Sequence, residues 1–336
     1  MHIGLEDRPR HHATGASRLD LMPLPDEPRL RQTTGLVLRA LSGFYTIATD
    51  DGDRVEARLR GRMKKERQAS DLAVIGDRVT VERLADGTGA ITSVEPRTRR
   101  FSRRQPGPRG SWREDVMVAN ADLVAVVFAC DRPPPNPRLI DRFLVVAEYN
   151  EVPALLVANK VDLVVPEAAH NLFNPYERIG YDVVYASAKA DIGLEALRGR
   201  LAGMLSIVTG PSGVGKSTLL NALQPGLQLM TGEVSDVLSG KGKHTTTHAE
   251  LHPLAGEAGG FVADTPGIRE LGLWQIPSTE LASCFPEFRP HLGACAFNDC
   301  THIHEPRCAL RAAVEAGSVS EDRYDSYRRL LIGDPA

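Results

Sequence analysis

The chain has 336 residues, of which 42% are apolar and 25% charged, a composition typical of globular proteins with two or three domains. It contains no run of about eighteen apolar residues, which excludes a transmembrane helix. Residues 1–32 lack the apolar segment of a secretory signal. We therefore expect a disordered tail there and a cytoplasmic protein that binds no membrane.

Charge is distributed unevenly along the chain, whose net charge is -3. Between Arg31 and Glu114, eighteen Lys or Arg stand against eleven Asp or Glu. Such a basic stretch is typical of proteins that bind a phosphate backbone, although a merely well-solvated surface has the same composition. Charge alone leaves both interpretations open.

The five cysteines are an odd number, and three of them lie within fourteen positions near the C-terminus. This crowding favours a metal site in a reducing compartment over a disulfide framework. We interpret the isolated Cys130 and Cys284 as small buried hydrophobic residues.

Short apolar or alternating runs broken by Gly and Asp fill residues 33–96. Five strands are expected, at 35–38, 44–48, 55–59, 77–81 and 89–94, which is the number in an OB-fold β-barrel. The insert before the fourth strand is basic, with Arg60, Arg62, Lys64, Lys65 and Arg67. This insert suits RNA contact, and the alternative is a solvated linker that touches nothing.

Residues 97–118 combine several arginines with Pro and Gly, which predicts a flexible basic linker at a domain boundary. From residue 119 to 276, apolar strands alternate with helical stretches, the pattern of a mostly parallel sheet covered by helices on both faces. Strands are expected at 123–129, 153–158, 182–186, 206–209 and 260–263. Residues 277–336 predict a mainly helical domain with a terminal helix at 320–331, so the chain is expected to be a multidomain α/β protein.

A phosphate-binding loop of the P-loop type follows the strand expected at 206–209. Its residues are Gly210, Pro211, Ser212, Gly213, Val214, Gly215, Lys216 and Ser217, and Thr218 continues into a helix. In such a loop, backbone N–H groups wrap the α- and β-phosphates at a helix N-terminus. Lys216 would neutralise β- and γ-phosphate oxygens, and the Ser217 hydroxyl would bind Mg²⁺. The alternative is a glycine-rich turn before a helix.

Two further motifs indicate guanine rather than adenine, and each follows an expected strand. The first is Asn159, Lys160, Val161 and Asp162, and the second is Ser187, Ala188 and Lys189. Asp162 can accept two parallel hydrogen bonds from the ring N–H and the exocyclic amine of guanine, a pair that adenine does not offer. The Lys160 stem can lie along the base, and the second motif would place a backbone N–H near the guanine carbonyl.

A fourth element lies at Asp264 to Gly267, again after an apolar strand. Asp264 would hold Mg²⁺ through water, and the Gly267 amide would sense the γ-phosphate. Upstream, the glycines of a segment that contains His244 and Thr247 favour a mobile loop, in which Thr247 would complete the Mg²⁺ shell. An isoleucine follows Gly267 where a water-orienting glutamine often lies, so His244 is our candidate for that role; the alternative is a surface histidine.

The order of these motifs predicts a circular permutation, because the base-reading motifs precede the phosphate loop. Sites in an α/β sheet lie at the carboxyl ends of strands whatever the connectivity, so a permuted chain can keep the pocket. The segment after Asp264 leads directly into the C-terminal domain. Hydrolysis could therefore move that domain.

Near the C-terminus, Cys295, Cys300, His302 and Cys308 supply three thiolates and one imidazole. This is the ligand set of a closed structural zinc site, which contributes roughly 10–16 kcal/mol of apparent binding energy at neutral pH. His304 is a competing ligand, and we expect it to face solvent.

Together and in this order, the motifs resemble the RsgA family, also called YjeQ, over roughly residues 33–331. The resemblance implies a GTPase that binds the maturing small ribosomal subunit and its rRNA through its OB and zinc domains. It also implies stimulation by the subunit and action late in assembly. The family's loop histidine corresponds to His244, and its zinc ligands correspond to the three cysteines and His302. The divergent barrel leaves the RNA contacts unassigned, and we expect a monomer that uses GTP, Mg²⁺ and one Zn²⁺.

Two other functions remain open at this point. One is a zinc-stabilised RNA-binding scaffold with GTP as a structural ligand, and the other is a permuted GTPase that serves the large subunit. Phosphate release with and without small subunits separates the first from an enzyme. Co-sedimentation with separated subunits tests the second.

Overall fold

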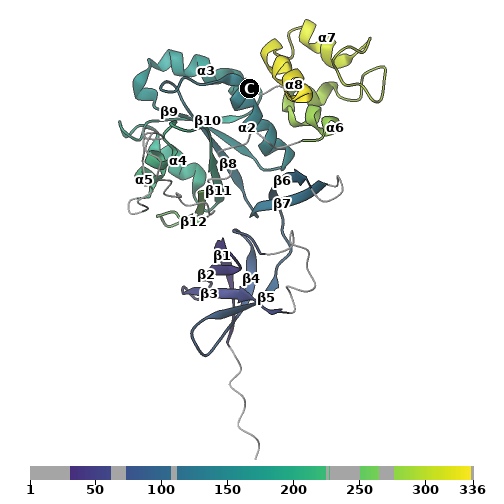
Figure 1. The fold of residues 1–336 in the computed structure, drawn as a ribbon. Coiled ribbons are helices and arrows are strands. Elements are labelled where there is room, and N and C mark those ends of the chain that lie inside the picture. Colours follow the sequence, from purple (N-terminus) through teal and green to yellow (C-terminus); the bar gives the residue numbers. More distant parts are fainter. Residues whose placement is uncertain are drawn as a thin grey trace, which may run out of the picture.

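The computed structural model describes residues 31–61, 73–106, 112–224, 227, 250–264 and 276–333. The chain forms a barrel, a central α/β domain and a helical C-terminal domain, arranged in a row (Figure 1). Within the described ranges, no helix is both long and apolar enough to cross a bilayer. The predicted tail lies almost entirely outside the described residues and stays a prediction.

The N-terminal domain is a closed five-stranded barrel, as predicted. Its strands are β1 (Gln32–Leu41), β2 (Phe44–Thr49), β3 (Arg54–Leu59), β4 (Arg78–Arg83) and β5 (Gly89–Val94). β1 pairs with both β2 and β4, and β3 pairs with β5 in parallel, which closes the sheet. Because side chains alternate along a strand, Val37, Ile47, Val79 and Ile91 all point inward and are fully buried.

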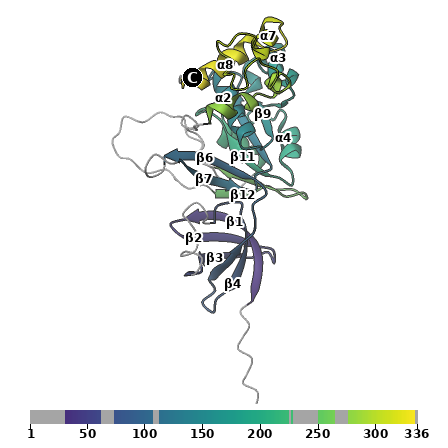
Figure 2. The same cartoon turned by 90° about the vertical axis from the view of Figure 1, so that its right-hand side faces the viewer.

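The segment predicted as a flexible linker contains a hairpin instead, made of β6 (Arg100–Pro106) and β7 (Trp112–Ala119) (Figure 2). Arg103 Nε lies 2.8 Å from Asp115 Oδ2 across this hairpin. Phe101 and Val118 are opposite each other in the pairing register, and both are buried in the core of the central domain. The linker prediction was wrong because it gave most weight to the arginines and prolines. The short alternation of charged and apolar residues in the same segment is the pattern of a strand.

The central domain has five parallel strands in the order β10-β9-β8-β11-β13, with β12 antiparallel beside β13. The strands are β8 (Leu123–Ala129), β9 (Ala154–Asn159), β10 (Asp182–Ala186), β11 (Leu205–Thr209), β12 (Glu250–Pro253) and β13 (Phe261–Asp264). Along β8, Val126 and Phe128 pack in one core, and Ala125 and Val127 pack in another on the opposite face. A strand that is apolar on both faces requires cover on both, which confirms the predicted architecture.

Helices cover the two faces of this sheet. They are α2 (Pro137–Tyr149), α3 (Pro166–Arg178), α4 (Leu194–Leu201) and α5 (Lys216–Leu223), and the 3₁₀ turn η3 (Val161–Leu163) follows β9. α2 and α3 contribute to the first core, and α4 and α5 to the second. The start of α2 is fixed by Asn136, whose side chain accepts a hydrogen bond from the Arg138 N–H, and by Pro137 in the first turn.

The C-terminal domain, residues 276–333, is mainly helical, as predicted, with turns and bends at 292–308. Its elements are α6 (Ser278–Leu281), η5 (Ala282–Cys284), η6 (Pro286–His291), α7 (Ala309–Glu315) and α8 (Glu321–Ile332). The rings of Phe285 and Phe288 stack at 4.6 Å between centroids, and Tyr327 meets both edge-on. This small aromatic core includes Val145 of α2 and so continues onto the central domain.

Candidate nucleotide and metal sites

All five parallel strands of the central sheet end at one edge, and four of the predicted nucleotide motifs begin there. β9 ends at Asn159, β11 is followed directly by Gly210, and β13 ends at Asp264. Ser187 follows β10 in the same way. In open α/β sheets this edge is where ligands bind, whatever the order of strands along the chain.

A cavity of about 410 Å³ lies at this edge. It is lined by Arg132, Asn159, Lys160, Asp162, Leu163, Ser187, Ala188, Lys189, Gly215 and Thr218. Both base-reading motifs and the end of the phosphate loop therefore meet in one space, although up to 59 positions separate them in the sequence. Arg132 is an addition that the sequence analysis did not identify.

Asn159 ties the first base-reading motif to the phosphate loop. Its side chain is 2% exposed, and its Nδ2 donates to the Val214 carbonyl oxygen at 2.8 Å. A Cβ on Gly215 would lie 2.5 Å from that Nδ2, and the φ of Gly215 is +95°. Only glycine fits this close approach, so the amide and the loop set each other's position.

Lys160 joins three loops. Its backbone is left-handed, with a φ of +61°, and its ammonium donates to the Gly213 carbonyl oxygen at 2.8 Å and to the Arg132 carbonyl oxygen. Arg132 belongs to the loop between β8 and α2. Because β8 is the middle strand of the five, its carboxyl end lies at the site. The apolar strand predicted at 123–129 was therefore the signal in the sequence that could have identified this loop.

Ser187 orients Asp162. The Ser187 hydroxyl donates to Asp162 Oδ1 at 2.5 Å, and the Ala190 N–H donates to the same hydroxyl at 3.1 Å. The Ser187 N–H is used elsewhere, because it donates to the Ile192 carbonyl oxygen at 2.9 Å. The role of Ser187 is thus to hold the aspartate through its side chain.

The phosphate loop wraps the start of α5. Gly210 has a φ of +139°, and a Cβ there would lie 2.1 Å from the Val127 carbonyl oxygen of β8, so the loop packs directly on the sheet. The Lys216 ammonium donates to the carbonyl oxygens of Gly210 and Pro211, at 2.7 and 2.6 Å. Ser217 lies in the first turn of α5, where N–H groups are free of intrahelical partners.

Four predicted site features lie wholly or partly outside the described residues. His244, Thr247 and Gly267 belong to ranges that the structure does not describe, as does the side chain of Asp264. Their assignments stay predictions from the sequence.

The predicted metal ligands come together in the C-terminal domain. The ligand atoms of Cys295, Cys300, His302 and Cys308 all lie within 4.8 Å of one another. Cys295 Sγ lies 3.8 Å from Cys308 Sγ, and His302 Nδ1 lies 3.4 Å from Cys308 Sγ. A tetrahedral zinc site with Zn–S bonds of about 2.3 Å has sulfur–sulfur edges of about 3.8 Å, so the cluster can hold a metal ion.

Two tyrosines of α8 fix the chain around the imidazole ligand. The Tyr324 hydroxyl donates to the His302 carbonyl oxygen at 2.6 Å, and the Tyr327 hydroxyl donates to that of Thr301 at 2.7 Å. His302 itself has a φ of +62°. His304 is exposed and lies outside the cluster, in agreement with its prediction as a spare histidine.

Two family models match the chain. The model of the RsgA GTPase matches residues 94–274, and that of the RsgA N-terminal domain matches residues 34–91. The chain belongs to the RsgA GTPase family. It is therefore a GTP hydrolase.

Relatives named small ribosomal subunit biogenesis GTPase RsgA align along most of the chain. That of Gemmatimonas aurantiaca is 52% identical over 300 residues, which cover 89% of this chain and 96% of the relative. That of Geobacillus kaustophilus is 40% identical over 296 residues, with 87% and 94% covered. The similarity thus spans all three domains.

Two solved structures have the same fold. YjeQ from Thermotoga maritima superposes with a TM-score of 0.73 at 33% identity, covering 90% of this chain and 99% of its own. YloQ, described as a circularly permuted GTPase, superposes with a TM-score of 0.69 at 29% identity, with 93% and 98% covered. The predicted permuted fold is confirmed.

In this RsgA family member, the two isolated cysteines are buried, as predicted. Cys130 is 4% exposed and Cys284 is 3% exposed. Burial, followed by the charge of Asp162, raises the pKa of the Cys130 thiol to about 11. Burial also raises the pKa of Cys284 to about 11. Both thiols lie outside the metal cluster found among the described residues, and burial with a raised pKa keeps them protonated at neutral pH.

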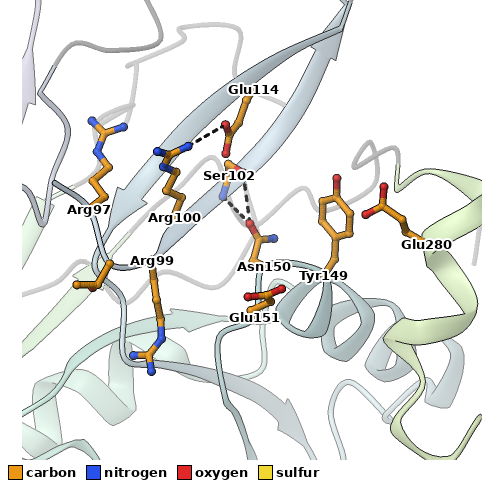
Figure 3. A pocket seen from close by; sticks show the side chains of 10 residues that line it. Arg97, Arg99, Arg100, Ser102, Glu114, Tyr149, Asn150, Glu151 and Glu280 are labelled. Atoms are coloured by element: carbon orange, nitrogen blue, oxygen red, sulfur yellow. Dashed lines mark hydrogen bonds and ion pairs between the residues drawn. The ribbon is translucent and has the colours of Figure 1, made fainter. Parts of the chain in front are cut away.

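A second cavity, of about 440 Å³, lies between the hairpin, the end of α2 and α6 (Figure 3). Arginine and glutamate side chains share its wall, and Arg100 Nη1 lies 3.7 Å from Glu114 Oε2. Asn150 Oδ1 accepts hydrogen bonds from the Ser102 N–H at 2.7 Å and from its hydroxyl at 3.4 Å, which fastens the hairpin to α2. Among the described residues that line this cavity, none belongs to a predicted nucleotide motif, which favours the smaller cavity as the nucleotide site.

Proposed function

We propose that this chain hydrolyses GTP to GDP and phosphate on the small ribosomal subunit, late in its maturation, and that the subunit stimulates the reaction. The observation that carries the proposal is the cavity in which both base-reading motifs meet the phosphate loop. The names of the relatives supply the small subunit as the partner. The protein would act in the cytoplasm as a monomer.

In this proposal, guanine lies in the cavity of about 410 Å³ against Asp162. The carboxylate accepts from the ring N–H and the exocyclic amine, and the Ser187 hydroxyl keeps it in place. The Lys160 stem lies along the base while its ammonium stays on the Gly213 carbonyl oxygen. Because the Ser187 N–H is already bonded to Ile192, the donor to the guanine carbonyl would be the Ala188 N–H.

The phosphates would lie on the amides of the phosphate loop at the N-terminus of α5. That helix end favours negative charge, because its first N–H groups have no intrahelical partner. Lys216 would turn from its two carbonyl partners to the β- and γ-phosphates, and Ser217 and Thr247 would bind Mg²⁺. Asp264, at the end of β13, would hold Mg²⁺ through water, and the Gly267 amide would sense the γ-phosphate.

The attacking water would be positioned by His244, because the aliphatic side chain of Ile268 cannot do so. Such a site would be incomplete until a partner completes it, which would give slow intrinsic turnover and strong stimulation. The segment after β13 leads into the C-terminal domain, so loss of the γ-phosphate would change the position of that domain on the subunit.

The cysteine and histidine cluster would hold one structural Zn²⁺. Three thiolates and one imidazole complete a tetrahedral shell and leave no open position for chemistry. The metal would stabilise the C-terminal domain, which together with the barrel would bind the subunit.

Phosphate release, measured with and without purified small subunits, tests this function. We expect strong stimulation of the wild-type protein, and we expect His244→Ala to lower the stimulated rate about a hundredfold or more while GDP binding is unchanged. GDP should bind far more tightly than ADP. No stimulation at saturating subunits would instead favour a scaffold with GTP as a structural ligand, and preferential co-sedimentation with large subunits would favour the other partner.

A further inference from the structure

The outer face of the barrel carries an exposed aromatic ring at a fixed position. Phe44 is 47% exposed and is the first residue of β2. It follows the two-residue turn of Ser42 and Gly43, whose φ values of +51° and +81° match a tight type I′ hairpin. Such a turn sets the register of β1 and β2, so the ring does not move along the sheet.

Arg58 stacks on this ring. Phe44 and Arg58 are direct partners in the pairing of β2 with β3, and the guanidinium carbon lies 4.1 Å from the ring centroid. The two side chains form a flat, cationic surface, which we call the Phe44–Arg58 platform. Such a surface has an apolar face and a positive charge together.

A second cation extends the platform. Arg54 lies on the same side of β3, because it is four residues from Arg58, which is about 13 Å along a strand. Among the described residues, neither Arg54 nor Arg58 has an ion-pair partner, whereas Arg60, Arg78 and Arg83 of the barrel do. The single carboxylate between them, that of Glu56, accepts a hydrogen bond from the Thr46 hydroxyl at 2.5 Å.

Nucleic acid has the complementary chemistry. An unpaired base offers a π-face for an aromatic or guanidinium plane, and its flanking phosphates offer negative charge. The second and third strands of an OB-fold form the face that such ligands commonly use. A base inside a duplex has both faces covered by its neighbours, so it cannot stack here without leaving the helix.

We propose that the Phe44–Arg58 platform binds an unpaired RNA base by stacking and that Arg54 contacts a phosphate of the same strand. The inference rests on the proposed function, which supplies RNA as the partner, and it names the residues and the RNA structure that the barrel recognises. The platform distinguishes single strands from duplex and reads no base sequence.

The test uses the full-length protein and fluorescence anisotropy of two labelled RNAs, an oligouridine of about ten nucleotides and a blunt-ended RNA duplex without unpaired bases. Phe44→Ala should weaken oligouridine binding about tenfold and leave duplex binding unchanged, and Phe44→Trp should restore oligouridine binding to within about twofold of wild type. Phe297→Ala is a matched control. Phe297 is 44% exposed, but it lies between the metal ligands Cys295 and Cys300 in the sequence. Among the described residues, no arginine stacks on its ring.

Equal losses for the oligouridine and the duplex would overturn the inference, as would a Phe44→Trp variant no better than Phe44→Ala. GDP affinity, measured on the same samples, should be wild-type for all variants, because the exposed ring supports no fold. Stimulation of the wild-type protein by small subunits is a separate measurement. Its absence would reject the proposed function while leaving the stacking result to be judged by itself.

Discussion

The two flanking domains are attached to the central domain by different kinds of contact. At the barrel, main-chain hydrogen bonds join the two domains in addition to side-chain contacts. Arg39 of β1 pairs with Glu250 of β12, so the barrel and the central sheet share one hydrogen-bonded ladder of eleven strands. Close by, the Ala119 N–H donates to the Ile75 carbonyl oxygen at 2.9 Å, and the Ile75 side chain packs in the central core.

At the C-terminal domain, the contacts belong to side chains and several of them are charged. Arg323 of α8 is 5% exposed, and its Nη1 lies 2.6 Å from Asp141 Oδ1 of α2. The same guanidinium lies 2.6 Å from Glu287 Oε1 and packs over the Phe285 ring at 4.6 Å. Although burial lowers the pKa of Arg323, the Asp141 and Glu287 carboxylates raise it above its usual range, so the Arg323 guanidinium keeps its charge.

This difference indicates that the stability of the C-terminal junction depends more on single side chains than that of the barrel junction does. A main-chain ladder survives most substitutions, because every residue supplies the same N–H and C=O groups. A buried ion pair does not, because loss of one partner leaves the other charged and without water. The C-terminal junction should therefore be fragile to loss of Arg323, and the main-chain pairing of β1 with β12 at the barrel should respond mainly to changes in backbone geometry.

The largest expected effect is that of metal removal. A chelator should unfold the C-terminal domain and leave the barrel intact, because a structural zinc site contributes roughly 10–16 kcal/mol of apparent binding energy at neutral pH. Thiol titration at pH 8 measures this. The three cysteines of the metal cluster should react rapidly after chelation, and so should Cys284, because it lies in the core of the same domain. Cys130 lies in the core of the central domain and should stay slow, since it is buried with a pKa of about 11.

Barrel integrity is followed in the same samples by amide hydrogen exchange. Slow exchange in β1 to β5 after chelation would agree with separate attachment of the two flanking domains. If the cluster thiols stayed protected without metal, the ligand assignment would be wrong.

The next effect is that of Arg323→Met, which leaves the Asp141 and Glu287 carboxylates buried without a cation. We expect a loss of about 3–5 kcal/mol in the free energy of unfolding, measured by urea titration with exchange protection of α8 as the probe. Arg138→Met is the matched control. Its partner is Asp325, at 3.3 Å, and both side chains are more than a third exposed, so its removal should cost less than about 1 kcal/mol. Similar losses in the two variants would contradict the proposed dependence on burial.

Most of the fold could be predicted because its signals are local. An apolar run such as β8 is stable only in a strand covered on both faces, and an alternating run such as β3 only in a strand with one face buried. The nucleotide motifs were found in permuted order because each lies directly after its own strand, and the sheet brings the strand ends together. The hairpin and the four-residue strand β12 were missed because short or charge-rich strands give a weak pattern.

Contacts between distant residues could not be predicted. Asp141 and Arg323 are 182 positions apart, and nothing in either local sequence selects the other. The same holds for the Ser187 hydroxyl, whose bond to Asp162 depends on the spacing of β9 and β10. Such side-chain partners follow from the packed fold and not from periodicity or motif.

The smallest expected effect is at the barrel junction. Gly76 has a φ of +84°, and a Cβ there would lie 2.1 Å from the Ala119 carbonyl oxygen. The Gly76 carbonyl oxygen accepts from Asn120 Nδ2 at 2.9 Å. Gly76→Ala combines left-handed strain with a backbone clash, so we expect a loss of about 1–3 kcal/mol in the free energy of unfolding, measured by thermal unfolding and by amide hydrogen exchange in β1 and β12.

Glu250→Ala is the control: it keeps the main-chain pairing, so its free energy of unfolding should stay within about 0.5 kcal/mol of wild type. If it destabilised this junction more than Gly76→Ala, side chains and not backbone geometry would hold the barrel, and the contrast with the C-terminal domain would fail.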